Sequence, residues 1–338
     1  MRILYLALLV FVFFSSVQVK FPSSSGFISI FTLLLFFIIF VFTCSTRKVE
    51  KRWLIGFIIF FSTTIVNQSS ILSSGLILVF LCANLLVKNE PVDSHVDFLE
   101  RFSFIIIVFF LFTLALNLAG INDFTLWSST KEELGGFPRL RMFSDEASYF
   151  GMIVVAFLFL SASRLKICIY SFLFVISQSY YSILYFVLLI FRRFVNLIII
   201  TSLIFSFFLF PFLLAFPELY FSNSGLIRLI GLNLIPSMDF SQWVFGSGIG
   251  LGDKALTPLF NSFGVENGSG FLFSFFYDVG ALGLFGYFLC VCRNRFDVIL
   301  LTFLLLNFGA ASFNIIFIIS ISRYLFLKSD KWVFKSPI

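Results

Sequence analysis

The segment 138–151 carries the residues best suited to chemistry. It brings two cations and two carboxylates together, namely Arg139, Arg141, Asp145 and Glu146. Arginine offers paired donors that suit a phosphate or pyrophosphate group, and a nearby carboxylate can accept a proton or orient a substrate. Ser144 or Asp145 can also cap a helix that begins there, and the positive end of that helix would favour an anion. An ordinary capping box with surface ion pairs is the alternative.

Arg228 is a second candidate for binding an anion. It lies in the apolar stretch Ser224–Ile230, where a lone cation is costly unless it is paired. A salt bridge to Glu218 or Asp239 would satisfy it equally well, and both interpretations stay open. The five cysteines lie inside or at the edge of apolar blocks without metal-site spacing, and no nucleotide-binding glycine loop is visible. We therefore expect no metal and no cofactor.

These groups belong to a chain of 338 residues that is 60% hydrophobic and only 12% charged. A soluble domain carries about 25% charged residues. The apolar blocks are close to the roughly 20 residues with which a helix crosses a bilayer, and they lack the alternation of a barrel strand. We expect an all-α polytopic membrane protein with about 10–12 transmembrane helices, forming a single integral membrane domain over residues 1–338.

The hydrophobic pattern also predicts where the helices lie. Two stretches, 167–191 and 297–327, are interrupted by small and polar residues at 177–182 and 307–314, so we expect each to form two short helices. The clearest spans are predicted at 3–19, 26–44, 53–66, 71–87, 102–118, 149–163, 195–215 and 270–292.

The distribution of positive charge predicts a topology. If both interrupted stretches are split, both termini are cytoplasmic and all but six of the 23 Lys and Arg residues lie on the cytoplasmic side. Two long outer loops follow, at about 119–148 and 216–269. Because the basic residues cluster at span ends rather than along one stripe, nucleic acid is not an expected partner. The six outer cations suggest an anionic substrate there: Lys20, Lys131, Arg139, Arg141, Arg228 and Lys254.

Two segments in the middle of the chain resemble motifs of a known family. Arg141–Gly151 is similar to the R-x-x-x-x-E-P-S-x-F-x signature of bacterial O-antigen and capsular polysaccharide repeat-unit polymerases of the Wzy type, within the O-antigen ligase and polymerase superfamily. Ala147 stands where that signature has proline. Ser177–Tyr180 falls where the family often has a serine-rich break between short helices, although Tyr180 replaces an arginine.

A third resemblance extends over the second predicted outer loop. Phe245–Gly250, then Asn267, then Tyr277–Leu284 look like the family's succession of G-x-G, N and G-x-x-G. Glycines at such positions permit tight turns and close helix packing. The order and spacing of these motifs over Arg139–Leu284 carry the resemblance, whereas the first four predicted spans match only as hydrophobic bulk.

The resemblance implies a function and a location. It implies a GT-C-like glycosyltransferase of the bacterial cytoplasmic (inner) membrane that joins undecaprenyl-pyrophosphate-linked oligosaccharide repeat units at the periplasmic face. An acceptor hydroxyl would attack the anomeric carbon of the donor, and lipid pyrophosphate would leave. Membrane lipid is a further partner, and a chain-length regulator protein is one that the resemblance allows. The resulting site assignments are Arg139, Arg141, Arg228 and Asn267 for substrate binding, and Glu146 or Asp145 as the catalytic base or orienter.

Two other functions remain as alternatives. An O-antigen ligase shares the architecture, but such ligases are expected to use a histidine in the large outer loop. Here Glu266 stands just before Asn267, and the single histidine, His95, falls in a predicted cytoplasmic loop. A flippase or transporter of lipid-linked oligosaccharides would place charges within its spans and keep its outer loops short. The predicted spans are nearly free of charge, with Asp278 close to the outer end of its span as the main exception, so a polymerase is favoured.

Overall fold

The computed structural model describes the chain mainly from Glu50 onward, and almost all of the described residues are helical. The predicted spans at 3–19 and 26–44 and the loop at 119–148 lie almost wholly outside the described residues, and the span at 102–118 is described only in fragments. The described residues are 19–20, 27–28, 50–67, 71–88, 103–105, 107–108, 111–112, 115, 119, 147–161, 163–177, 179–216, 226–262 and 271–332.

One short strand pair departs from the predicted helices. β1 (Val19–Lys20) pairs antiparallel with β2 (Phe27–Ile28), and Val19 lies opposite Ile28. The spans predicted at 3–19 and 26–44 include Val19, Phe27 and Ile28, and the prediction of a helix is wrong for these three residues. Proline, serines and glycine stand between the strands in the sequence, and such residues favour a turn over a continuous helix. The all-α class holds for the rest of the described chain.

The chain divides into two compact units, the first of which comprises 1–45, 87–192 and 316–338. Its described core is α6 (Ala147–Leu160), which packs on α7 (Arg164–Ser177) and α8 (Tyr180–Ile190). Most of α15 (Phe313–Trp332) also belongs here. The rings of Phe157 and Phe317 lie 5.8 Å apart, and the hydroxyls of Tyr185 and Ser322 are hydrogen-bonded at 2.7 Å.

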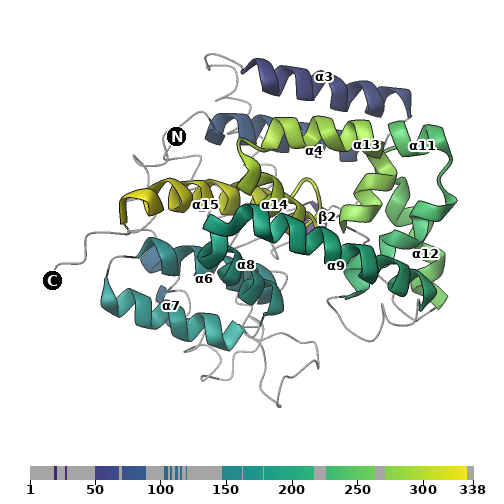
Figure 1. Ribbon diagram of the computed structural model, residues 1–338. Helices are drawn as coiled ribbons and strands as arrows, with labels where there is room; N and C mark the ends of the chain where they lie inside the picture. Colours follow the sequence, from purple (N-terminus) through teal and green to yellow (C-terminus); the bar gives the residue numbers. More distant parts are fainter. Residues whose placement is uncertain are drawn as a thin grey trace. The chain divides into compact units, whose positions relative to one another are not determined.

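The second unit, 46–86 and 193–315, is organised around a helix pair. α3 (Lys51–Val66) runs antiparallel to α13 (Phe271–Val291), with Gly56 against Gly286 and Thr63 against Gly283. Glycines at the crossing let the two backbones approach closely. α4 (Ile71–Lys88) also meets α13, because the ring of Phe80 stacks on Tyr287. α13 bends within its length at Gly280, as Figure 1 shows in yellow-green.

Both predicted helix breaks are confirmed. α7 ends at Ser177 and α8 begins at Tyr180, with Ser179 as the N-cap that accepts a hydrogen bond from the amide of Ser182. In the second stretch, α14 (Arg295–Leu305) ends well before α15 begins at Phe313. The long helix α9 (Val195–Ala215) matches its predicted span.

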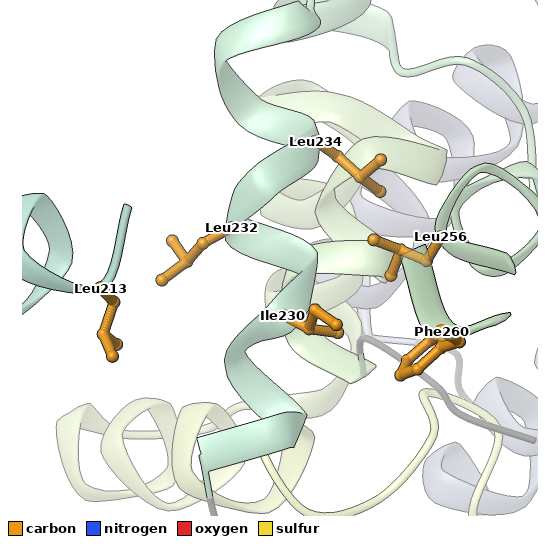
Figure 2. Close-up of a cluster of buried hydrophobic side chains, with 6 residues drawn as sticks. All are labelled: Leu213, Ile230, Leu232, Leu234, Leu256 and Phe260. Atoms are coloured by element: carbon orange, nitrogen blue, oxygen red, sulfur yellow. The ribbon is translucent and has the colours of Figure 1, made fainter. Parts of the chain in front are cut away.

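The segment predicted as the second outer loop is largely folded. It contains the 3-10 helix η2 (Leu226–Ser237), α11 (Phe240–Phe245) and α12 (Leu251–Ser262). In Figure 2, Leu232 points from η2 toward α9, whereas Ile230 and Leu234 point toward α12. Burial of each such side chain is worth about 1.5–3 kcal/mol. The buried cluster comprises Leu213, Ile230, Leu232, Leu234, Leu256 and Phe260.

The lengths of the described helices give limited support to a membrane location. Among the described helices, two are long and apolar enough to cross a bilayer, Asn196–Ala215 and Phe271–Val291. The first of these is 6% buried over its apolar window, and Phe205, Phe207 and Phe208 are exposed. Other described apolar helices, such as Tyr180–Ile190, are shorter. The number of crossings therefore stays a prediction.

Candidate functional site

Only one of the predicted site residues is described. The other five lie outside the described residues, so their positions relative to one another stay a prediction. They are Arg139, Arg141, Asp145, Glu146 and Asn267. Arg228 lies in η2, where it is buried. The candidate site below is therefore built from Arg228 and from the glycine motifs of the second unit.

The contacts of Arg228 include a hydrogen bond and a cation–π contact. Its guanidinium donates to the backbone carbonyl of Asn307 at 3.0 Å and lies over the ring of Phe271, 5.4 Å from the ring centroid. A guanidinium over an aromatic face gains about 0.5–2 kcal/mol. Asp239, one of the two salt-bridge partners considered from the sequence, is the N-cap of α11 instead, and Glu218 is outside the described residues.

The break between α14 and α15 explains the first of these contacts. The last carbonyls of a helix lack partners within that helix, so they accept hydrogen bonds from elsewhere. Asn307 follows the end of α14 and its carbonyl accepts from Arg228, while the carbonyl of Ala310 accepts from the hydroxyl of Tyr287. The polar break that the sequence predicts thus supplies backbone acceptors to two side chains.

The second contact involves an unusual backbone. Phe271 is the first residue of α13 and has a φ of 39°, in the left-handed region that residues with a side chain rarely adopt. Such conformations cost about 1–3 kcal/mol and persist only where the surroundings impose them. The constrained backbone at the start of α13 therefore sets the position of the Phe271 ring over which the Arg228 guanidinium lies.

The glycine motifs form a compact loop around Asp278. The loop Gly246–Gly250 connects α11 to α12, and its amides reach α13: Ser247 N donates to the Tyr277 carbonyl and Gly248 N to the Asp278 carbonyl, both at 2.9 Å. The Asp278 side chain then accepts from Gly250 N at 2.8 Å and from Gly252 N at 2.6 Å. One residue of α13 thus holds both the loop and the start of α12.

Two glycines make this arrangement possible. Gly246 has φ 80° and ψ 179°, and Gly280 has φ 66° and ψ −178°, a region that is essentially restricted to glycine. They also lie against each other: a Cβ on Gly280 would meet the Gly246 amide and the Val244 carbonyl, and one on Gly246 would meet the Asp278 carbonyl. The bend in α13 is the point at which the glycine loop docks.

Two further groups close the loop region. Asn67, the C-cap of α3, donates from its side chain to the Phe245 carbonyl, and its own carbonyl lies against Gly248. On the other side, Ser274 donates to Asp253 at 2.7 Å. We call these residues together with Gly246–Gly250 and Asp278 the glycine-loop region.

This geometry decides what Asp278 can do. Both of its carboxylate oxygens accept backbone N–H groups, so the side chain holds the loop rather than facing a substrate proton. Within the described part of the chain, no group of three or more His, Cys, Asp or Glu residues is arranged to hold a metal ion. The glycine-loop region is thus a hydrogen-bonded support, and Arg228 is the cation that the described part of the candidate site contributes.

Sequence reasoning recognised these motifs but missed the role of Asp278. Asp278 stands inside an otherwise apolar span, which is the signal that could have identified it. In the first unit, the two other family-like segments also meet: Ser182 Oγ donates to the Ser148 carbonyl at 3.4 Å, and Gly151 lies against the hydroxyls of Ser177 and Ser182. The serine-rich break therefore packs on the start of α6.

No protein-family model matches this sequence, and no curated protein or solved structure matches the chain.

Proposed function

We propose that this chain polymerises lipid-linked oligosaccharide repeat units at the outer face of the bacterial cytoplasmic membrane, as the resemblance to the Wzy-type polymerases implies. The observation that carries the proposal is Arg228, a cation buried in the segment predicted as the large outer loop. A buried cation that is fixed by a carbonyl and an aromatic ring is suited to an anionic leaving group such as lipid pyrophosphate.

The proposed reaction needs two kinds of groups. The acceptor hydroxyl attacks the anomeric carbon, the bond from that carbon to the pyrophosphate oxygen breaks, and the hydroxyl proton passes to a base. Arg228, Arg139 and Arg141 would stabilise the negative charge on the leaving pyrophosphate, with Asn267 as a further substrate contact. Glu146 or Asp145 would accept the proton or orient the acceptor.

The docking of the glycine motifs supports the same proposal. The two segments that resemble the family's G-x-G and G-x-x-G motifs are distant in sequence, yet they bond to each other through Asp278 and pack across Gly246 and Gly280. Motifs that form one structural unit are less readily explained as chance glycine-rich turns. The exposed apolar surface of α9 supports a membrane location, since a soluble domain rarely exposes an apolar patch larger than a few hundred Å².

A deletion strain and matched variants test this function. Loss of the chain should leave single repeat units on the lipid core, whereas loss of a flippase leaves none at the surface and loss of a ligase leaves polymer on its lipid carrier. Arg228→Ala should then lower polymerisation about 100-fold to 1,000-fold, as expected when one charge-stabilising donor is removed. Arg164→Ala removes an exposed cation on the predicted cytoplasmic side and should leave chain length normal. Normal chain length in the Arg228→Ala strain, with the protein in the membrane, would exclude the clamp.

A further inference from the structure

The short helix α11 exposes an aromatic edge. Phe240 is 85% exposed, Trp243 and Phe245 are each 42% exposed, and Leu251 at the start of α12 is 39% exposed. Below, the term aromatic edge means these four residues. These four exposed apolar side chains lie within twelve residues of one another in the sequence, and apolar residues exposed together mark contact with another protein or with a membrane.

The helix pair α3 and α13 gives this edge a position relative to a bilayer. At one end of the pair, Arg52 donates to the carbonyl of Arg293, and Lys51 and Arg295 are exposed beside them in the sequence. At the other end, Asn67 contacts Phe245 and Gly248. The helix from Arg52 to Asn67 covers roughly 22 Å at 1.5 Å per residue. Because arginines reach out of the hydrocarbon into the polar layer, this length approaches the hydrocarbon thickness.

If the helix pair crosses a bilayer, the aromatic edge would lie at the membrane surface opposite the arginines. Trp243 packs edge-to-face on Phe276 of α13, with ring centroids 5.3 Å apart. The helix α11 is therefore attached to one of the two described helices that are long enough to span a bilayer. Tryptophan is enriched at this depth because its ring is apolar and its N–H is polar. The apolar surface of α9, in the same unit, is exposed as well, and lipid would cover both surfaces without a further protein.

The start of α11 is also suited to a region poor in water. Asp239 accepts from the Gln242 amide at 2.8 Å, and the Gln242 side chain accepts from the Asp239 amide at 3.0 Å. This capping box satisfies donors that would otherwise need water. The backbone of α11 can therefore enter the interfacial layer at low cost.

We propose that α11 lies in the interfacial layer of a phospholipid bilayer, with the aromatic edge inserted at the boundary between headgroups and acyl chains. This inference rests on the membrane location in the proposed function, not on the reaction. Its consequence is that the glycine-loop region, which follows α11 directly, lies at the depth of the lipid phosphates. A lipid-linked pyrophosphate would occupy that same depth.

Fluorescence quenching measures this depth without any activity assay. The full-length protein with Trp53→Phe, Trp127→Phe and Trp332→Phe retains Trp243 alone and is reconstituted in phosphatidylcholine vesicles. Lipids brominated close to the headgroup should quench Trp243 more than lipids brominated near the acyl end, and more than acrylamide in water. If the triple variant does not fold, the difference between the native protein and Trp243→Phe reports the same residue.

Three outcomes would overturn the inference. Quenching by acrylamide with none by lipid would place α11 in water, and stronger quenching by the deeper bromine would place it in the hydrocarbon core. Protection of Trp243 from acrylamide that appears only at high protein density in the vesicles would show that a second copy of the chain, not lipid, covers the aromatic edge. The matched control retains only Trp53, which is buried and should be quenched weakly by both lipids. None of these outcomes depends on whether the chain polymerises glycans.

Discussion

Replacing Gly280 with alanine tests the account of the bend in α13. At φ 66° and ψ −178°, an L-residue costs about 1–3 kcal/mol. The added Cβ would also lie 2.6 Å from the Val244 carbonyl, and relieving such overpacking costs about 1–3 kcal/mol more. The expected destabilisation is therefore about 2–6 kcal/mol, the sum of the two costs.

The assay is thermal unfolding of the purified protein in detergent. At about 2–4 °C per kcal/mol, Gly280→Ala should lower Tm by at least about 4 °C. Gly75→Ala is the matched control, because an added Cβ at Gly75 in α4 meets nothing within 4 Å and alanine favours a helix. Equal Tm values for the two variants would refute the reasoning that the bend requires glycine.

Three further predictions concern Asp278, Asp239 and Gly151. Asp278→Ala leaves the amides of Gly250 and Gly252 without this acceptor and, at about 1–3 kcal/mol per amide, should destabilise the protein by about 2–6 kcal/mol. The Tm of Asp278→Asn should lie between those of Asp278→Ala and the native protein. Equal Tm values for all three proteins would contradict the anchoring role. Hydrogen bonds from Gln242 and Ser241 lower the pKa of Asp239 from 3.8, so its contribution to α11 is present above that pH and is lost as the pH falls through the lowered value. Trp243 fluorescence should follow this acid transition, and Asp239→Ala should abolish it. Gly151→Ala would bring a Cβ to 2.7 Å from Ser177 Oγ and should lower Tm, whereas Gly309→Ala meets nothing within 4 Å and should not.

The helices follow largely from hydrophobic pattern. The breaks near Ser177 and Asn307 were predictable because small polar residues interrupt apolar runs, and such residues prefer caps and turns to a helix interior. The bounds of α9 were predictable because its apolar run is uninterrupted. Local composition carried these predictions.

What the sequence did not predict depends on tertiary contacts. Within the predicted outer loop, the described residues 226–262 form helices because apolar residues such as Ile230 and Leu256 bury each other across chain segments, and the prediction of a loop did not include this packing. Asp278 binds the amides of Gly250 and Gly252, and Arg228 binds the backbone carbonyl of Asn307. Every residue has a backbone, so the sequence does not show which backbone group will bind a given side chain, and only the fold identifies these partners.

The most direct test of the proposed function is a reconstituted reaction. Purified protein in vesicles is given lipid-linked repeat units extracted from the deletion strain, without any other enzyme. We expect a ladder of longer lipid-linked glycans with release of undecaprenyl pyrophosphate. The ladder should be lost in the Arg228→Ala protein and kept in the Arg164→Ala protein. Unchanged single units with folded, correctly inserted protein would contradict it.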